Sequence, residues 1–427
     1  MSAAETNDAG NAARVSAWKL SALFGIFYFV QGIAEPTAGL ISQPVQSLLK
    51  NWGNSAERIS LFQFLLSLPW SCKPIYGLLT DFVPLAGYRR KSYLVGASIV
   101  TAAMLTVLYL FPLPDGAIWL LLGLLLLPTL GVAFSDVVVD ALMVDKGQPL
   151  GLTGRFQSIQ WGTIWGASIL TGSLGGYLSQ YGQQQLGFLI CGLATLMTLA
   201  LAITSVREPR EHARPDLRGA LGTLREAATS PAILPIALFL FLWNFNPFAS
   251  TVQYYHMTHE MGISEEDYGV TQSLYAVASM VGSLLYGLYC RRLSHAWMIQ
   301  LSIVFGVMQT VAYALMYDLQ SARLVALASG FTYATAQMVQ LDLAAQCCPP
   351  RVAGTAFALL MSLSNLGVSL STMLGGWWYD RWRVDYGSDR AFDLLVFVGA
   401  GFTACCWLLV PLLRRAVPEP LPAEAEA

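Results

Sequence analysis

The sequence predicts an all-α polytopic membrane protein in which twelve transmembrane helices form two six-helix pseudo-repeats. Three observations predict this fold class: the scarcity of charge, the distribution of basic residues, and short matches between the two halves of the chain. Of the 427 residues, 55% are hydrophobic and only 12% are charged, whereas a soluble chain carries about 25% charged residues. With a mean hydropathy of +0.53, the chain has too little polar surface for a water-soluble body of this size, so lipid must be part of its solvent.

The composition also argues against several classes of function. The lack of polar surface disfavours a soluble enzyme, and a net charge of −2 offers no basic field for nucleic acid. The seven cysteines have neither the density of a disulfide scaffold nor metal-ligand spacing, so we expect no metal ion and no cofactor. A membrane-embedded enzyme is the alternative from another class, but the sequence offers no two-histidine metalloprotease motif, nucleophile elbow or Gly-rich phosphate loop, and so no catalytic residue.

Each expected transmembrane helix is an apolar stretch of about 20 residues or more, the length that crosses about 30 Å of hydrocarbon. Residues 1–17 form a polar tail without a cleavable signal pattern, so the first stretch should stay attached. Twelve stretches meet the criterion, at residues 18–45, 59–80, 92–112, 117–145, 155–179, 185–205, 231–257, 266–290, 296–316, 321–347, 353–379 and 391–413.

The basic residues test this count independently, because Lys and Arg accumulate in cytoplasmic loops. If both termini share one side, that side holds 17 of the 24 basic residues, the opposite side holds six, and Lys73 alone lies within a stretch. We therefore expect both termini in the cytoplasm, and a bacterial inner membrane as the location.

The longest polar interruption, at 206–230, contains five Arg residues and is expected to be a cytoplasmic linker. It would divide the chain into an N-terminal half (18–205) and a C-terminal half (231–413), followed by a cytoplasmic tail (414–427). Short matches support a duplication: Leu-Gly-Gly at 174–176 returns at 374–376, and Tyr-Gly-Leu at 76–78 returns at 286–288. Two related helical halves favour a monomeric secondary transporter, with a small-molecule solute bound near the midplane, over a channel or receptor.

An acid at a helix end followed by a basic cluster marks the connection after the second stretch. The residues are Gly77, Asp81, Gly87, Arg89, Arg90 and Lys91, which we call the latch. In this interpretation Gly77 allows close approach of a neighbouring helix, Asp81 pairs with basic groups or a helix N-terminus, and the basic trio binds anionic headgroups. The alternative is simple positive-inside topology with an interfacial acid.

The latch resembles the loop signature of the major facilitator superfamily, stretched by the insertion at 82–86. The fuller pattern is similar to the folate–biopterin transporter family, in the segments KPIYGLLTD at 73–81, PLAGYRRKSYL at 84–94, SDVVVDALMV at 135–144, and GRFQS at 154–158. This resemblance implies the major facilitator fold, a folate-like or pterin-like solute and symport, and it adds Arg155 to the latch. Glu35-Pro36 departs from the family pattern, and a muropeptide-type or siderophore-type permease of the same superfamily is the alternative.

Five ionisable residues lie deep within the stretches: Glu35, Lys73, Asp136, Asp140 and Asp342. Each costs about 3 kcal/mol or more in hydrocarbon unless it faces a cavity or a partner. Asp136 and Asp140 are spaced i, i+4, which places both carboxylates on one helical face about 6 Å apart. Because two carboxylates so close in a low dielectric cannot both ionise cheaply, we expect one of them to carry a proton. The alternative is that the pair bonds a neighbouring helix or Lys73.

Three of these charges are also candidates for binding the solute. Lys73 has a side chain long enough to offer a positive group to an anion in a central cavity, although pairing with the acids is equally open. Glu35 precedes Pro36, which breaks the helix and frees backbone carbonyls, and this context favours a cavity-lining acid, for solute or proton, over a structural one. Asp342 lies in the tenth stretch, the counterpart of the fourth, and is assigned to the solute.

A flat heterocycle is held by stacking and by amide hydrogen bonds. The side chains that supply these groups within the stretches are Trp161, Trp165, Asn244, Asn246, Gln337 and Gln340. The segment 243–247 also contains Pro247 and is expected to break the seventh stretch. The alternative is that the aromatic residues belong to packing or to the interfacial belt.

Overall fold

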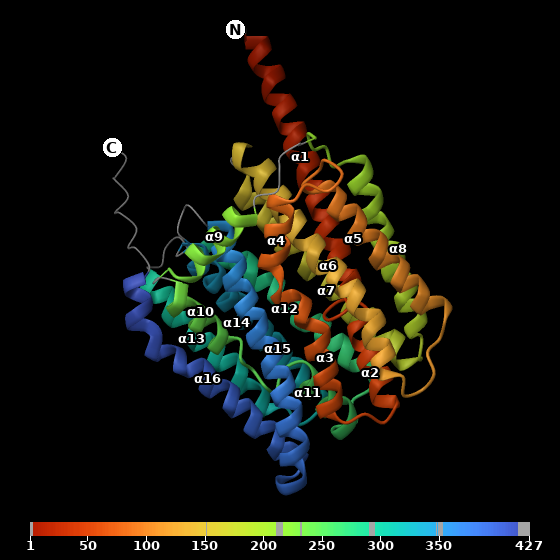
Figure 1. The fold of residues 1–427 in the computed structure, drawn as a ribbon. Helices are drawn as coiled ribbons and strands as arrows, with labels where there is room; N and C mark the ends of the chain where they lie inside the picture. The colour runs from red at the N-terminus through yellow and green to blue at the C-terminus, as the bar shows by residue number, and fades with distance from the viewer. Residues whose placement is uncertain are drawn as a thin grey trace.

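The structure, a computed structural model, describes residues 3–150, 152–210, 217–230, 233–289, 295–346, 348 and 353–416. Within this part of the chain every named element is a helix. Figure 1 shows the helices in two groups that lie side by side, one coloured red to yellow-green and the other green to blue. The prediction of an all-α membrane fold is therefore confirmed.

The first group contains the helices that precede the expected linker. In chain order they are α1 (Ala3–Ala34), α2 (Ser42–Asn51), α3 (Ala56–Ser71), α4 (Lys73–Phe82), α5 (Lys91–Leu110), α6 (Ile118–Gly147), the short η1 (Gln148–Leu150), α7 (Thr153–Gln180) and α8 (Gln184–Thr204).

The second group follows α9 (Leu217–Ala228), which lies within the expected linker. Its helices are α10 (Ile233–Trp243), α11 (Thr251–Tyr255), the π-helical η2 (His256–Glu260), α12 (Glu265–Tyr289), α13 (His295–Ala312), η4 (Tyr313–Leu315), α14 (Leu319–Gln346), α15 (Ala353–Tyr386) and α16 (Ser388–Ala416).

Parts of the expected division lie outside the described residues. These are positions 211–216 of the linker, the tail at 417–427, and the loop residues Arg214, Arg291, Arg292 and Arg351, which contribute to the charge bias. The boundaries of the two halves therefore stay a prediction.

Seven helices in the described part of the chain are long and apolar enough to cross a membrane. They coincide with the expected stretches at 18–45, 92–112, 117–145, 185–205, 296–316, 353–379 and 391–413. The other five stretches coincide with helices that are shorter or more polar: α3 with α4, α7, α10 with α11, α12, and α14. Since α7 packs on α12 and α3 on α15, these helices face protein and need less apolar surface. The count of twelve crossings stays a prediction.

Three of the expected stretches are broken helices. The expected break at Pro36 is confirmed, because α1 ends at Ala34 and α2 begins only at Ser42. The expected break at 243–247 is also confirmed, because α10 ends at Trp243 and α11 begins at Thr251. The third break, at Cys72 between α3 and α4, was not predicted. It places Pro74 in the first turn of α4, where a residue without an N–H is tolerated.

The glycines matched between the halves make equivalent contacts between the two groups of helices. A Cβ on Gly176 of α7 would lie 2.9 Å from the carbonyl oxygen of Glu265 on α12. A Cβ on Gly376 of α15 would lie 2.7 Å from the carbonyl oxygen of Ala56 on α3. Only glycine permits backbones to approach this closely. The matched positions therefore hold the two groups together at two related interfaces.

Candidate functional site

Asp136 of α6 lies in a buried ion pair. Its Oδ2 accepts a hydrogen bond from Lys73 Nζ at 2.6 Å, and its Oδ1 accepts one from Gln31 Nε2 at 2.7 Å. The helix break at Cys72 makes Lys73 the first residue of α4. Only 5% of the Asp136 side chain and 17% of the Lys73 side chain are exposed. Both carboxylate oxygens of Asp136 are thus occupied by donors, one of them charged.

Asp140, one turn further along α6, has neutral donors instead. The hydroxyl of Tyr28, which is fully buried, donates to Asp140 Oδ1 at 2.5 Å, and Gln160 Nε2 donates to the same oxygen at 3.1 Å. Among the described residues, both hydrogen bonds to this side chain reach Oδ1 and none reaches the second oxygen, Oδ2. The structure brings Lys73, Asp136 and Asp140 together as the sequence indicated, and adds Tyr28, Gln31 and Gln160.

Lys73 is also tied to the first helix break through an indole ring. Its ammonium lies 4.8 Å from the centroid of Trp70, a cation–π contact. The indole N–H of Trp70 donates to Glu35 Oε1 at 3.0 Å. A single row of contacts thus runs from Asp136 through Lys73 and Trp70 to Glu35.

Glu35 makes hydrogen bonds that stabilise the local fold. It is 6% exposed and accepts hydrogen bonds from the Thr37 amide at 2.9 Å, from the Thr37 hydroxyl at 2.7 Å, and from the Ala38 amide. These donors follow the break in the chain, where backbone N–H groups have lost their helical partners. The sequence favoured a cavity-lining acid. The structure shows a carboxylate that stabilises the turn after Pro36, and a role for Glu35 toward solute or proton stays a prediction.

Aromatic rings form a row that joins the two groups of helices. Trp161 and Trp165 of α7 have centroids 6.5 Å apart, and Trp165 contacts Tyr275 of α12 at 6.5 Å. Tyr275 contacts Tyr333 of α14 at 5.9 Å, and Tyr333 contacts Trp243 of α10 at 5.8 Å. The sequence indicated Trp161 and Trp165 as candidates. It did not indicate Tyr275 and Tyr333, which lie one turn before Ser279 on α12 and Gln337 on α14.

Within the part of the chain that the structure describes, three polar atoms beside this row have no hydrogen-bond partner. They are Trp165 Nε1, Gln337 Oε1 and Gln340 Nε2, all buried. The side-chain oxygen of Gln340 is used, since it accepts from Asn244 Nδ2 at 3.3 Å. Buried polar atoms normally have partners, so these two donors and one acceptor are exceptions.

Two other candidates for solute binding lie apart from these atoms. Asn246 donates to the Trp243 carbonyl at 3.1 Å and accepts from Thr310 at 3.3 Å, so its amide stabilises the end of the broken α10. Asp342 lies two residues beyond Gln340 on α14, and residues so spaced point to different sides of a helix. Asn246 and Asp342 are therefore not grouped with Gln340.

The latch is an ion-pair network at the ends of α4, α5 and α6. Arg90 donates to Asp81 Oδ1 at 2.5 Å and lies 3.8 Å from Asp145 Oδ2. The expectation that Asp81 pairs with a basic group is thus confirmed. The Glu208 carboxylate accepts the backbone N–H groups of residues 89–91 at 2.9–3.1 Å and so caps α5. Asp145 and Glu208 were missed, because each lies more than 50 residues from Arg90 in sequence.

Other latch residues differ from the sequence interpretation. The closest atom to a Cβ built on Gly77 is Val137 Cγ1 at 3.9 Å, an ordinary contact, so Gly77 does not mark a close approach. Gly87 is required by a turn, with φ of +83°. Lys91 binds the carbonyl oxygens of Ile203 and Val206 rather than reaching for headgroups. Arg155 is exposed at the start of α7.

An ion pair between the two groups of helices lies at the end of the molecule away from the latch, where Figure 1 shows α2 and α11. Lys50 of α2 contacts Glu265 of α12 at 2.5 Å, with 15% and 11% of their side chains exposed. Gln43 Nε2 and the Tyr254 hydroxyl also donate to Glu265, at 3.0 and 2.7 Å. The contacts of Lys50 and Gln43 with Glu265 join α2 of the first group to α12 of the second group at that end.

Comparison with known proteins decides the family. Residues 31–420 match the BT1 family. The chain belongs to the BT1 family. The folate-biopterin transporter of Synechocystis sp. is 30% identical over 382 residues, which cover 84% of this chain and 74% of that protein. Probable folate-biopterin transporter 4 of Arabidopsis thaliana is 22% identical over 92% of this chain and 94% of that protein. The expected resemblance to folate–biopterin transporters is confirmed.

Solved structures with the same fold are transporters of the major facilitator superfamily. The D-xylose-proton symporter superposes with a TM-score of 0.69 at 15% identity, covering 95% of this chain and 98% of that one. The nucleoside transporter NupG gives a TM-score of 0.68 at 12% identity, covering 94% and 98%. The BT1-family chain therefore has the major facilitator fold. It is a multi-pass membrane transporter of a small-molecule solute and not an enzyme.

Proposed function

We propose that this BT1-family protein moves a folate-like or pterin-like solute across the membrane by alternating access, with proton symport. It works as a monomer in a bacterial inner membrane, with both termini in the cytoplasm. The names of its relatives, which are folate-biopterin transporters, support the solute class, and the site supports the mode of binding.

The observation that carries the proposal is the aromatic row with its unpartnered polar atoms. A pterin is a flat ring with donors and acceptors on its edges, and it is held by stacking between aromatic side chains and by amide hydrogen bonds. Trp165 Nε1 and Gln340 Nε2 would donate to ring nitrogens or oxygens, and Gln337 Oε1 would accept from an amino group. Because Trp165 belongs to one group of helices and Gln340 to the other, such a solute would contact both.

The acid pair supports proton coupling. Asp140 is the residue proposed to carry the proton, since its Oδ2 has no donor among the described side chains while both oxygens of Asp136 are occupied. A proton on Asp140 removes one of the two negative charges near Lys73. The ammonium is then held less strongly, and an anionic group of the solute can compete with Asp136 for it. Proton and solute thereby favour each other's binding.

Uptake by the purified full-length protein in proteoliposomes tests this function. The probes are tritiated folic acid and biopterin, with a muropeptide and a ferric siderophore as competitors. We expect uptake of a folate or pterin that increases when the outside is made acidic and that a protonophore abolishes. Uptake of the muropeptide or siderophore alone would overturn the solute class, and folate uptake that ignores the gradient would overturn symport.

A further inference from the structure

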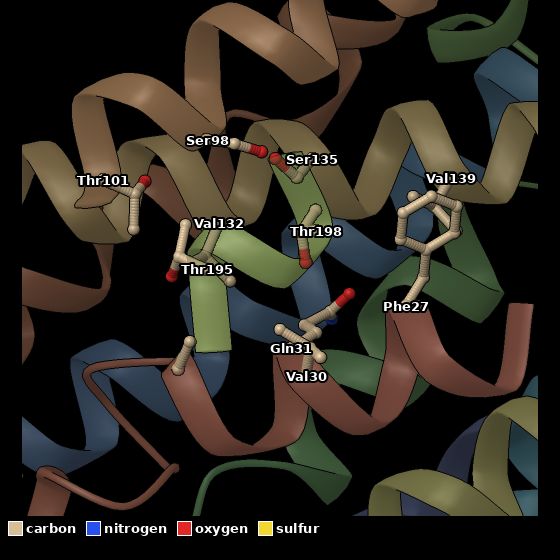
Figure 2. Close-up of a pocket in the computed structure, with 11 residues that line it drawn as sticks. Phe27, Val30, Gln31, Ser98, Thr101, Val132, Ser135, Val139, Thr195 and Thr198 are labelled. Carbon is tan, nitrogen blue, oxygen red and sulfur yellow. The ribbon is translucent and has the colours of Figure 1, made fainter. Parts of the chain in front are cut away.

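A small chamber with a mixed polar and apolar lining lies within the first group of helices, away from the aromatic row. Its volume is about 30 Å³, and its lining residues belong to α1, α5, α6 and α8. Six of its lining side chains are polar: Gln31, Ser98, Thr101, Ser135, Thr195 and Thr198. Figure 2 shows the Thr198 hydroxyl directed toward Gln31, and the hydroxyls of Ser98 and Ser135 directed toward each other. The function proposed above makes no use of this chamber.

The lining offers hydrogen-bond acceptors. Ser98 donates its hydroxyl hydrogen to the Leu94 carbonyl at 2.8 Å, and Thr195 donates its own to the Cys191 carbonyl at 2.9 Å. A hydroxyl has one hydrogen and two lone pairs, so these oxygens keep their lone pairs for a guest. The amide nitrogen of Gln31 is engaged with Asp136 at 2.7 Å, which leaves the amide oxygen as a further acceptor.

We propose that the chamber binds one or two water molecules, and that this water holds Gln31 with its amide N–H on Asp136. A water needs about 10–15 Å³ of such volume and two to four polar partners, and the chamber offers both. A water that donates to Gln31 Oε1 fixes the orientation of the amide, since the side chain could otherwise rotate and present its oxygen to the carboxylate. It also polarises the amide and strengthens the bond to Asp136.

Water fits the lining better than a metal cation does. Two carboxylates are adjacent in sequence to lining residues: Asp136 beside Ser135, and Glu35 beside Ala34. Both oxygens of Asp136 accept from Gln31 and Lys73, and both oxygens of Glu35 accept from the turn after Pro36. A cation among neutral hydroxyls would therefore be buried without a counter-charge, which costs far more free energy than burying water. The water, Gln31, Asp136 and Lys73 then form one continuous chain. Gln31, Thr195 and Thr198 are positioning residues for the ion pair. The effect of these three residues on transport rests on the proposed function.

Draining the chamber without changing its volume tests the proposal. Thr195→Val/Thr198→Val replaces two of the six polar side chains by apolar ones of similar size, which removes two of the polar partners that hold the water. Thr195→Ser/Thr198→Ser keeps the hydroxyls and is the rescue variant. Thr129→Val is the matched control, because Thr129 of α6 is fully buried, bonds its own helix at Leu125 and does not line the chamber.

The first measurement needs no solute. Infrared difference spectra of the full-length protein in lipid nanodiscs, recorded in ordinary water and in ¹⁸O water, report internal water as an O–H band that moves with the isotope. We expect this band in the wild type, the Ser variant and Thr129→Val, and its loss in the Val variant. A band that is absent from the wild type, or that survives in the Val variant, would overturn the proposal.

The second measurement is uptake of tritiated folic acid in proteoliposomes. Loss of one hydrogen bond in the chain should lower uptake by the Val variant about threefold to tenfold, with recovery in the Ser variant and no change in Thr129→Val. If the wild type requires Na⁺ and the Val variant loses that requirement, the chamber binds a cation and the water proposal is wrong. If the wild type takes up no folic acid, the proposed function fails, and the infrared result alone decides the inference.

Discussion

Asp136 and Asp140 lie one turn apart on α6, yet their partners differ. The charged partner of Asp136 is Lys73 at 2.6 Å, whereas Asp140 has the neutral donors Tyr28 and Gln160. The proposed function gives the two residues separate tasks, with Asp136 holding Lys73 and Asp140 exchanging the proton.

Replacing the proton carrier should uncouple transport without unfolding the protein. In Asp140→Asn the amide can still accept from Tyr28 but cannot bind a proton, so we expect the response of folic acid uptake to an acidic outside to disappear. Exchange of labelled for unlabelled folic acid across the membrane, which needs no gradient, should persist. Uptake by Asp140→Asn that still responds to the gradient would remove this residue from the coupling mechanism.

Breaking the ion pair should instead affect stability. Asp136→Asn leaves the Lys73 ammonium buried without its counter-charge, and losing one partner of a buried pair costs about 3–5 kcal/mol. We expect a lower melting temperature, measured with a thiol-reactive dye that reports exposure of the buried Cys191, Cys348 and Cys406.

The double variant Asp136→Asn/Lys73→Gln is the control for that measurement. With both charges removed, the melting temperature should recover toward the wild-type value, since the penalty of the unpaired charge is gone. If Asp136→Asn and the double variant melt at the same lowered temperature, the cost does not come from the unpaired lysine.

Sequence reasoning found the charged residues of the site but not their neutral partners. Asp136, Asp140 and Lys73 are detectable because a charge within an apolar stretch is rare and costly. Tyr28 and Gln31 lie more than 100 residues before the acids they bond, and Tyr and Gln within a stretch carry no comparable signal. The hydrogen-bond donors to Glu35 were not predicted for a related reason, because only the folded turn reveals that Thr37 and Ala38 supply them.

At the scale of helices, the close contact of α7 with α12 can be tested by substituting the glycine at the contact. Gly176→Ala would place a methyl group 2.9 Å from the Glu265 carbonyl oxygen, a backbone atom that can move only if the helices separate. We expect a net loss of about 1–2 kcal/mol in stability, because overpacking outweighs the gain in helix propensity. Gly166→Ala on the same helix is the control, since a Cβ there meets no atom within 4 Å.

The melting temperatures of these two variants should move in opposite directions. Gly166→Ala gains about 0.5–1 kcal/mol of helix propensity without a clash and should melt higher than the wild type. If Gly176→Ala also melts higher, the two helices are not held at the distance described here.

Hydropathy and proline predicted where most helices lie and where two of them break, since both signals are local. The break at Cys72 was not predicted, because Pro74 is also compatible with an uninterrupted helix. Whether this proline breaks the helix depends on how the helix packs. The latch was predicted only in part. Asp81 and Arg90 lie nine residues apart in one signature, but the cap from Glu208 arises from tertiary contact between the ends of α5 and α8.

Considered as a whole, the molecule must separate its two groups of helices at one end if it works by alternating access. The pair of Lys50 and Glu265 resists this, because it joins α2 to α12 with little exposure of either side chain. Glu265→Gln removes the attraction and leaves Lys50 buried unpaired in the closed form, whereas in the open form the ammonium is hydrated. We therefore expect the closed form to lose about 3 kcal/mol relative to the open one, a shift of roughly 100-fold in their ratio.

Labelling of an introduced cysteine measures this shift. Ser273 of α12 is 7% exposed and bonds Ser173 of α7 at 2.8 Å, so Ser273→Cys becomes reactive only when the two helices separate. In cells carrying this variant, with Cys72, Cys290, Cys347 and Cys405 replaced by Ser, a membrane-impermeant maleimide should label the introduced cysteine faster when Glu265→Gln is added. Arg323→Gln is the matched control, since it breaks the exposed pair with Asp267 within one group of helices, and such pairs contribute about 0–1 kcal/mol. Equal acceleration by both changes would mean that general loosening, and not this ion pair, governs opening.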